Sequence, residues 1–167
     1  MRLSLLLLAT LVPAVPVLAA ETPELQRAVG AAQAVGAVHT LRQIPEACTR
    51  LEGEFTGDAA TPYRFTAVRS SERCQPRARF VDYATAQPSQ AKGWKLNDVI
   101  RVPRAACPAQ QAVVRVWRLP GAQAPQRDGQ GQSRIYLEEA KQQAAAGTIA
   151  QVPMFTAQLQ VEGKACP

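Results

Sequence analysis

Residues 154–163, MFTAQLQVEG, alternate apolar and polar side chains along most of their length. One set contains Phe155, Ala157, Leu159 and Val161, and the other contains Thr156, Gln158, Gln160 and Glu162. Successive side chains of a strand point to opposite faces of the sheet, so this stretch predicts a strand with one buried and one wet face. Such strands are typical of antiparallel sheets.

Strand patterns also precede this stretch. They lie at about 49–56, 63–70, 77–84, 96–102 and 111–119. The first two flank the turn-rich segment TGDAATP and predict a hairpin. The fifth, AVVRVWRL, is expected to pair antiparallel with residues 152–162, the strand built on the opening stretch. With one or two helices, this predicts an α+β fold with a mainly antiparallel β-sheet, either a curved sheet or a small barrel.

The chain contains four cysteines, Cys48, Cys74, Cys107 and Cys166. An even number in an exported chain predicts two disulfides, for which three connectivities exist. Folding the hairpin brings Cys48 near Cys74, and pairing strands 111–119 and 152–162 brings Cys107 beside Cys166. We therefore predict these two bridges. No CxxC motif or closely spaced Cys/His pair favours redox or metal chemistry, and no metal or cofactor is expected.

Residues 1–20 have the pattern of a cleavable signal peptide, with Arg2, a leucine-rich centre and a small-residue end. Cleavage is expected after Ala19 or Ala20. The apolar run is too short, and too interrupted by proline, to predict a transmembrane segment. The expected organisation is a signal peptide at 1–20, an N-terminal helix within 21–45 and a disulfide-stapled β-rich domain at 46–167.

The N-terminal helix is predicted from Thr22 and Pro23, a plausible N-cap and first-turn pair. On a helical projection, glutamine and threonine form one narrow stripe, and alanine, valine and leucine cover most of the rest. Such a helix would pack on its own sheet, or alternatively on a partner. His39 falls on its apolar arc and is expected to be a hydrogen-bonded structural histidine. A second, shorter helix is predicted near 134–147, between Ser133 and Gly147.

The formal net charge is +6, and +5 without Arg2, which favours anionic partners. Arginine outnumbers lysine fifteen to four. This bias is typical of GC-rich bacterial genes and favours a bacterial periplasm, or secretion, over a eukaryotic pathway. In that compartment the expected anions are envelope polymers and acidic proteins rather than nucleic acid.

Six residues are candidates for an anion-binding surface, since neighbouring strands would gather guanidinium groups beside a tryptophan. They are Arg77, Arg79, Trp94, Arg101, Arg115 and Arg118. The alternative is a set of scattered, solvated arginines. Trp94, between two lysines, is either an exposed contact residue or a plug in the core.

Catalytic motifs are weak. No serine lies in a GxSxG or SxxK motif. Glu52 and Glu54 share one face of a predicted strand, which allows the carboxyl pair of a glycosidase, but solvated glutamates that meet Arg64 are the simpler interpretation. The sequence therefore predicts a non-enzymatic periplasmic protein that binds an envelope protein or an anionic envelope polymer. The alternatives are a cationic cell-wall glycoside hydrolase using Glu52 and Glu54, and an assembly factor of an envelope complex.

Overall fold

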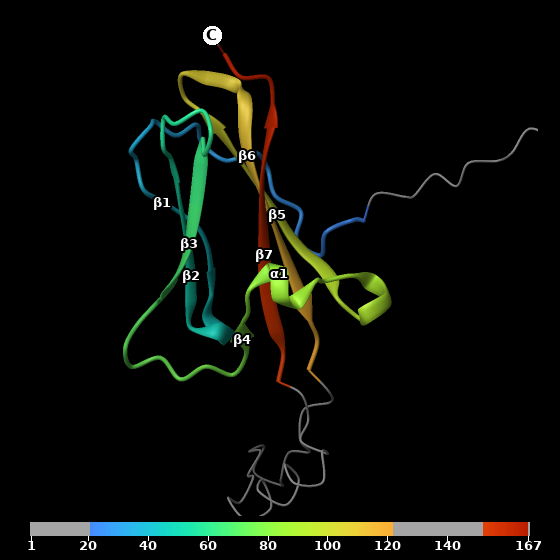
Figure 1. Ribbon diagram of the computed structural model, residues 1–167. Helices are drawn as coiled ribbons and strands as arrows, with labels where there is room; N and C mark the ends of the chain where they lie inside the picture. The colour runs from blue at the N-terminus through green and yellow to red at the C-terminus, as the bar shows by residue number, and fades with distance from the viewer. Residues whose placement is uncertain (1–20, 122–151, 167) are drawn as a thin grey trace, which may run out of the picture.

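Two antiparallel sheets lie side by side in the computed structural model, which describes residues 21–121 and 152–166 (Figure 1). The first has the order β1-β2-β3 and the second the order β4-β7-β6-β5. Their strands are β1 (His39–Ile44), β2 (Thr49–Phe55), β3 (Tyr63–Arg69), β4 (Arg79–Phe80), β5 (Lys95–Arg104), β6 (Cys107–Leu119) and β7 (Met154–Gly163). Three short helices connect them: η1 (Pro45–Ala47), α1 (Tyr83–Ala86) and η2 (Gln90–Lys92).

The predicted strand pairs are confirmed. β2 and β3 form the hairpin, in which Glu54 lies opposite Arg64. β6 and β7 are antiparallel over ten residue pairs, from Gln110 opposite Gly163 to Leu119 opposite Met154. Phe155 and Ala157 of β7 are buried, as their alternation with polar residues requires. Among the paired strands of the described residues, only β4 and β7 are parallel, and they pair over two residues.

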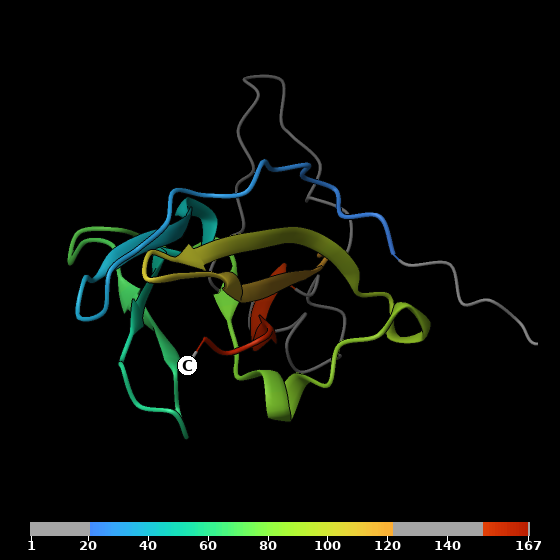
Figure 2. The same ribbon diagram turned by 90° about the horizontal axis from the view of Figure 1, so that it is seen from above.

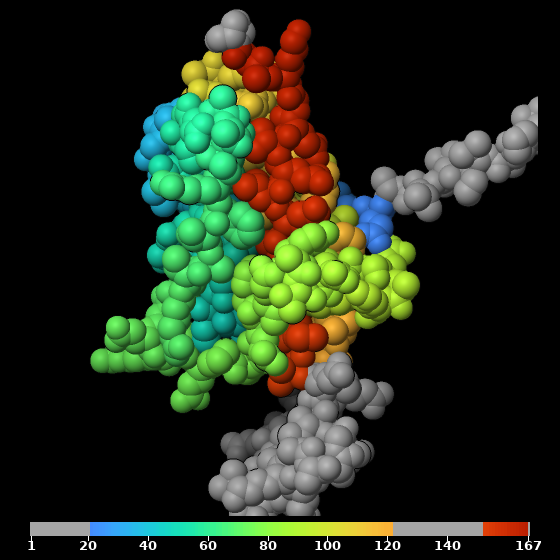
Figure 3. All heavy atoms as spheres, in the orientation of Figure 1, coloured from blue at the N-terminus to red at the C-terminus, as the bar shows by residue number. Residues whose placement is uncertain are grey.

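The core lies between the two sheets. Its largest cluster joins Leu51 and Phe55 of the first sheet to Val114 and Val116 of the second. A smaller cluster, Leu96, Val99 and Val113, packs with Trp117. In the described part of the chain the strands form two separate sheets that do not close into a barrel; the mainly antiparallel β structure is confirmed, whereas the small barrel is not found. Figure 3 shows the segment containing α1 over part of β7.

Both predicted disulfides are present. Cys48 bonds to Cys74 and Cys107 to Cys166, each with Cα atoms 5.7 Å apart. The first holds the loop after β3 against η1, and the second ties the start of β6 to the end of β7. The two bonds are compatible with an oxidising, extracytoplasmic compartment.

The predicted N-terminal helix is wrong. Residues 21–38, here called the strap, are extended and run along the free edge of β5 before entering β1 (Figure 2). Backbone N–H groups of Leu25, Gly30 and Gln33 donate to carbonyls of β5 at 2.8–2.9 Å. Glycine and β-branched valine have a low helix propensity. The edge of β5, in contrast, has unpaired backbone groups with which an extended strap can form hydrogen bonds. The strap packs on its own chain, but as an extended segment.

One further prediction needs correction, and two concern residues that the structure does not describe. The strand predicted at 77–84 is present only at Arg79–Phe80, because Asp82 caps α1 by accepting a hydrogen bond from the Thr85 amide at 2.9 Å. The predicted helix near 134–147 and the signal peptide at 1–20 lie outside the described residues. In residues 21–121 and 152–166, no helix has the length and apolar character needed to cross a membrane.

Gly53 is required by the hairpin, because a Cβ atom there would collide with the hydroxyl of Tyr63. Tyr63 is buried, packs edge-on against Phe55 and lies within the core, so it cannot move away freely.

Gly53→Ala is therefore expected to lower the free energy of unfolding by about 1–3 kcal/mol, as overpacking does. Urea denaturation measures this loss. Gly36→Ala is not a suitable control, because Gly36 has a positive φ and alanine there would strain the backbone. Ala67→Gly, at an exposed position of β3, is the control for a change between alanine and glycine within this sheet. A loss at Gly53 no larger than at Ala67 would contradict the collision.

Candidate functional site

The six predicted binding residues do not form one surface. Trp94 is only 5% exposed and is a plug in the core, so its prediction as an exposed contact is wrong. Arg101 and Arg115 lie on the same face of the second sheet, since Val99 is opposite Arg115 and Arg101 is opposite Val113. Arg77 and Arg79 lie at the other edge of this sheet, near β4.

Two of the predicted arginines are used by the fold. Arg115 donates to Gln160 at 2.6 Å and to Glu162 at 2.7 Å on β7. Arg118 forms a two-pronged bond to Glu24, with nitrogen–oxygen distances of 2.6 and 3.1 Å. The hydrogen bond from Arg118 holds the pKa of the Glu24 carboxyl below its usual value, and a second bond from Asn97 acts in the same direction. This ion pair fastens the start of the strap to β5 and β6.

The other three arginines, Arg77, Arg79 and Arg101, are exposed and have no carboxylate partner among residues 21–121 and 152–166. Two of them come from a loop that is held firmly. Ala78 is buried between Arg77 and Arg79, and the amides of Arg77 and Ala78 both donate to the Glu46 carbonyl, at 2.7 and 2.8 Å. Residues 70–79, here called the cationic loop, contain Arg73 and also Arg77 and Arg79, which flank the anchored Ala78.

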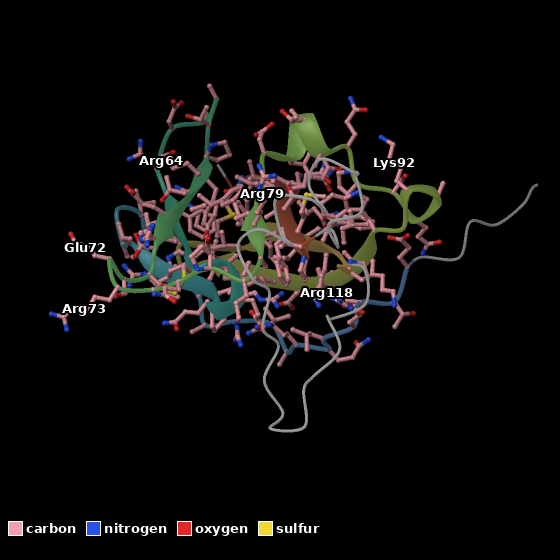
Figure 4. All side chains as sticks on the ribbon, turned by 90° about the horizontal axis from the view of Figure 1, so that it is seen from below. Arg64, Glu72, Arg73, Arg79, Lys92 and Arg118 are labelled. Carbon is pink, nitrogen blue, oxygen red and sulfur yellow. A yellow bond between two sulfur atoms is a disulfide. The ribbon has the colours of Figure 1, made fainter. Side chains whose placement is uncertain are left out.

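Other contacts also hold the cationic loop. The guanidinium of Arg69 donates to the carbonyls of Ser71, Glu72 and Cys74, and the Cys48–Cys74 bond anchors the loop covalently. Figure 4 shows Arg73, Arg64 and Lys92 extending from separate parts of the molecule, away from Arg79. These labelled basic side chains are therefore spread out, whereas Arg77 and Arg79 are exposed only two positions apart in the sequence.

Glu52 and Glu54 lie on the outer face of β2, whose residues alternate between the core and the surface. Glu54 meets Arg64 across the hairpin at 3.4 Å, as predicted. Glu52 pairs with Arg50 at 2.6 Å. Ion-paired, partly exposed carboxylates of this kind fit a solvated strand face, and the geometry adds no support for a glycosidase.

His39 is on β1 rather than on a helix, so its predicted placement is wrong. Its hydrogen bonding agrees with a structural role: Nδ1 lies 2.9 Å from the Ala37 carbonyl and Nε2 lies 2.8 Å from the Tyr63 hydroxyl. A carbonyl only accepts, so Nδ1 carries the proton and Nε2 accepts the bond from Tyr63. Burial raises the pKa of the Tyr63 phenol, which keeps it as a donor.

The structure reveals a buried ion cluster that the sequence analysis missed. Asp98 on β5 is fully buried and accepts from Nε of Arg27 at 2.8 and 2.9 Å and from Nη1 of Arg42 at 3.0 Å. Burial lowers the pKa of the Arg42 guanidinium, and the charge of Asp98 opposes that shift. A charged residue inside the apolar run of β5 was the available signal. Arg27, Arg42 and Asp98 together carry a net positive charge, and the more distant carboxylate of Glu46 also acts on Arg42.

A pocket of about 180 Å³ lies beside this cluster, between the strap and the edges of β1 and β5; we call it the seam pocket. The strap lines it with Arg27, Ala28, Gly30, Ala31 and Gln33, and the strands line it with His39, Thr40, Leu41, Ile100 and Val102. A bulge in β1, between Thr40 and Arg42, directs Arg42 toward Asp98. The pocket combines an aliphatic wall with one guanidinium group.

A larger hollow of about 460 Å³ lies near Trp94 and is more open to solvent. Its charged lining residues are Glu21, Glu24 and Lys95, and Glu24 is already paired with Arg118. Within the described ranges, no three His, Cys, Asp or Glu side chains gather as a metal site requires.

Comparisons of the chain with protein-family models, with curated proteins and with solved structures found no match. Function is therefore argued from the geometry alone.

Proposed function

We propose that this chain is exported to the bacterial periplasm and acts there as a non-enzymatic binding protein for an anionic partner of the cell envelope. The observation that supports it best is the cationic loop, where Arg77 and Arg79 are exposed on a backbone fixed by a disulfide and by two bonds to Glu46. Guanidinium groups bind carboxylates and phosphates through paired N–H donors. A rigid loop loses little conformational entropy when it binds.

The partner is an anionic polymer or an acidic envelope protein, and we favour the polymer. A polymer presents repeated carboxylate or phosphate groups, so two neighbouring arginines and a net positive charge are enough to hold it. An acidic protein would also need a buried contact area. The predicted aromatic anchor for such a contact, Trp94, is buried in the core. The exposed Arg101, at the opposite edge of the second sheet, is not part of the proposed surface.

The test compares two double variants with the same change of charge. Arg77→Glu/Arg79→Glu is expected to weaken binding of polyglutamate, measured by titration calorimetry at low salt, by about tenfold or more. Arg64→Glu/Lys92→Glu places the same charges far from the loop and is expected to retain most of the affinity. Equal weakening by both variants would show that only net charge matters and would overturn the proposed surface. Failure of the wild-type protein to bind would overturn the function itself.

A further inference from the structure

We propose that the seam pocket binds a small aliphatic carboxylate, held by the terminal amino groups of Arg27. This site lies at the β5 edge of the second sheet, whereas the cationic loop lies at the β4 edge. The inference therefore goes beyond the proposed function and concerns a second, separate ligand.

The first argument is charge. Asp98 neutralises one of the two guanidinium groups that contact it, and among the described residues these two arginines have no other carboxylate within bonding distance. Arg42 has only 11% of its side chain exposed and is balanced by Asp98 and by the more distant Glu46, so the guanidinium left without a countercharge is that of Arg27. One monovalent anion would bring the cluster of Arg27, Arg42 and Asp98 to neutrality. A carboxylate forms strong paired bonds with a guanidinium, so the remaining charge of Arg27 favours such a ligand.

The second argument is the set of free donors. Arg27 contacts Asp98 through Nε alone, which leaves Nη1 and Nη2 without a hydrogen-bond partner among residues 21–121 and 152–166. These two groups have the spacing that a carboxylate accepts in a paired bond. Arg27 has 42% of its side chain exposed and is one of the residues that line the pocket. Thr40, also in the lining, supplies a hydroxyl donor.

The third argument is the shape and polarity of the remaining walls. Leu41, Ile100 and Val102 form one wall, and two alanines of the strap form the other. The volume, about 180 Å³, is close to that of a roughly 150 Å³ cavity able to hold benzene, so a ligand of about six non-hydrogen atoms fits. A carboxylate with a short hydrocarbon tail, such as butyrate, matches both the charged end and the apolar walls. The same group occurs on a free short-chain acid and at the C-terminus of a peptide ending in alanine.

The experiment titrates the isotopically labelled mature chain with sodium butyrate and follows the amide signals of Gly30, Ala31 and Thr40 by NMR. Sodium chloride at matched ionic strength and neutral butyramide are the controls. We expect saturable shifts with butyrate only. Arg27→Lys retains a cation for Asp98 but loses the paired donors, so it is expected to bind butyrate about tenfold more weakly. Arg118→Lys makes the same change at the other strap ion pair and is expected to bind normally.

A second variant guards against a folding defect. Ala31→Leu narrows the pocket without touching Asp98 or its arginines and is expected to weaken binding as well. N-acetyl-alanyl-alanine separates the two sources: tighter binding of this peptide than of butyrate assigns a peptide terminus, and the reverse assigns a free acid. Equal shifts with butyramide, no saturable shifts with either acid, or wild-type affinity in Arg27→Lys would overturn the site. Binding of polyglutamate through Arg77 and Arg79 is measured separately and does not depend on this result.

Discussion

Replacing Cys107 and Cys166 together with alanine is expected to lower the free energy of unfolding by about 4 kcal/mol, as measured by urea denaturation. The bond joins residues 59 positions apart, and the loop it closes restricts the unfolded chain. Cys107 is also buried, at 1% exposure, where the start of β6 meets the end of β7. A loss of this size is a large fraction of the stability of an ordinary domain, so the variant should populate unfolded protein at 37 °C.

The second disulfide provides the comparison. Cys48 and Cys74 are 26 positions apart, so Cys48→Ala/Cys74→Ala is expected to cost slightly less, about 3.5 kcal/mol. This variant should also loosen the cationic loop and weaken polyglutamate binding, whereas the Cys107/Cys166 variant, while folded, should bind normally. A cost below about 1 kcal/mol for the longer bridge would show that β6 and β7 stay associated in the unfolded chain and would contradict the entropic argument.

Sequence pattern predicted the strands well where one face of the sheet is buried and the other is wet. In β2 buried and half-buried residues alternate without exception, whereas β7 has three consecutive buried residues in the core, Phe155, Thr156 and Ala157, and alternates only beyond them. Pairing these strands was enough to predict both disulfides, because it brings the chain segments that carry the cysteines within bonding distance. The strand predicted at 77–84 is shorter in the structure, because Asp82 caps α1 and the chain turns into that helix.

The strap could not be predicted from its own residues. Its alanines, valines and glycines fit the apolar face of a helix as well as an extended edge, and Leu25, Val29 and Val38 are exposed in the structure. The deciding interactions are with residues about 70 positions away, since Arg27 bonds to Asp98 and Asn97 bonds to Glu24. The seam pocket depends on those long-range contacts, so the local sequence pattern could not predict it either.

Changing Asp98 to asparagine is expected to lower the free energy of unfolding by about 3–5 kcal/mol, because it leaves the poorly solvated Arg42 without a charge partner. The variant also weakens the bond that fixes Arg27, because the amide oxygen of asparagine accepts without a negative charge, so the strap should detach from β5 before the sheets unfold. Hydrogen exchange at the Gly30 and Gln33 amides, which bond to β5 in the native state, measures this detachment. Urea denaturation measures the overall loss.

Two further variants separate the buried charge from simple loss of strap contacts. Glu24→Gln breaks the partly exposed pair with Arg118 and should cost less than about 1 kcal/mol, because water solvates Arg118 instead. Asp98→Leu/Arg42→Met removes both buried charges and should recover part of the stability lost in Asp98→Asn, since an apolar pair needs no desolvation of ions. If the double variant is less stable than Asp98→Asn, the cost comes from lost hydrogen bonds rather than from the unpaired charge. In that case the charge imbalance that favours an anion in the seam pocket is also smaller than we infer.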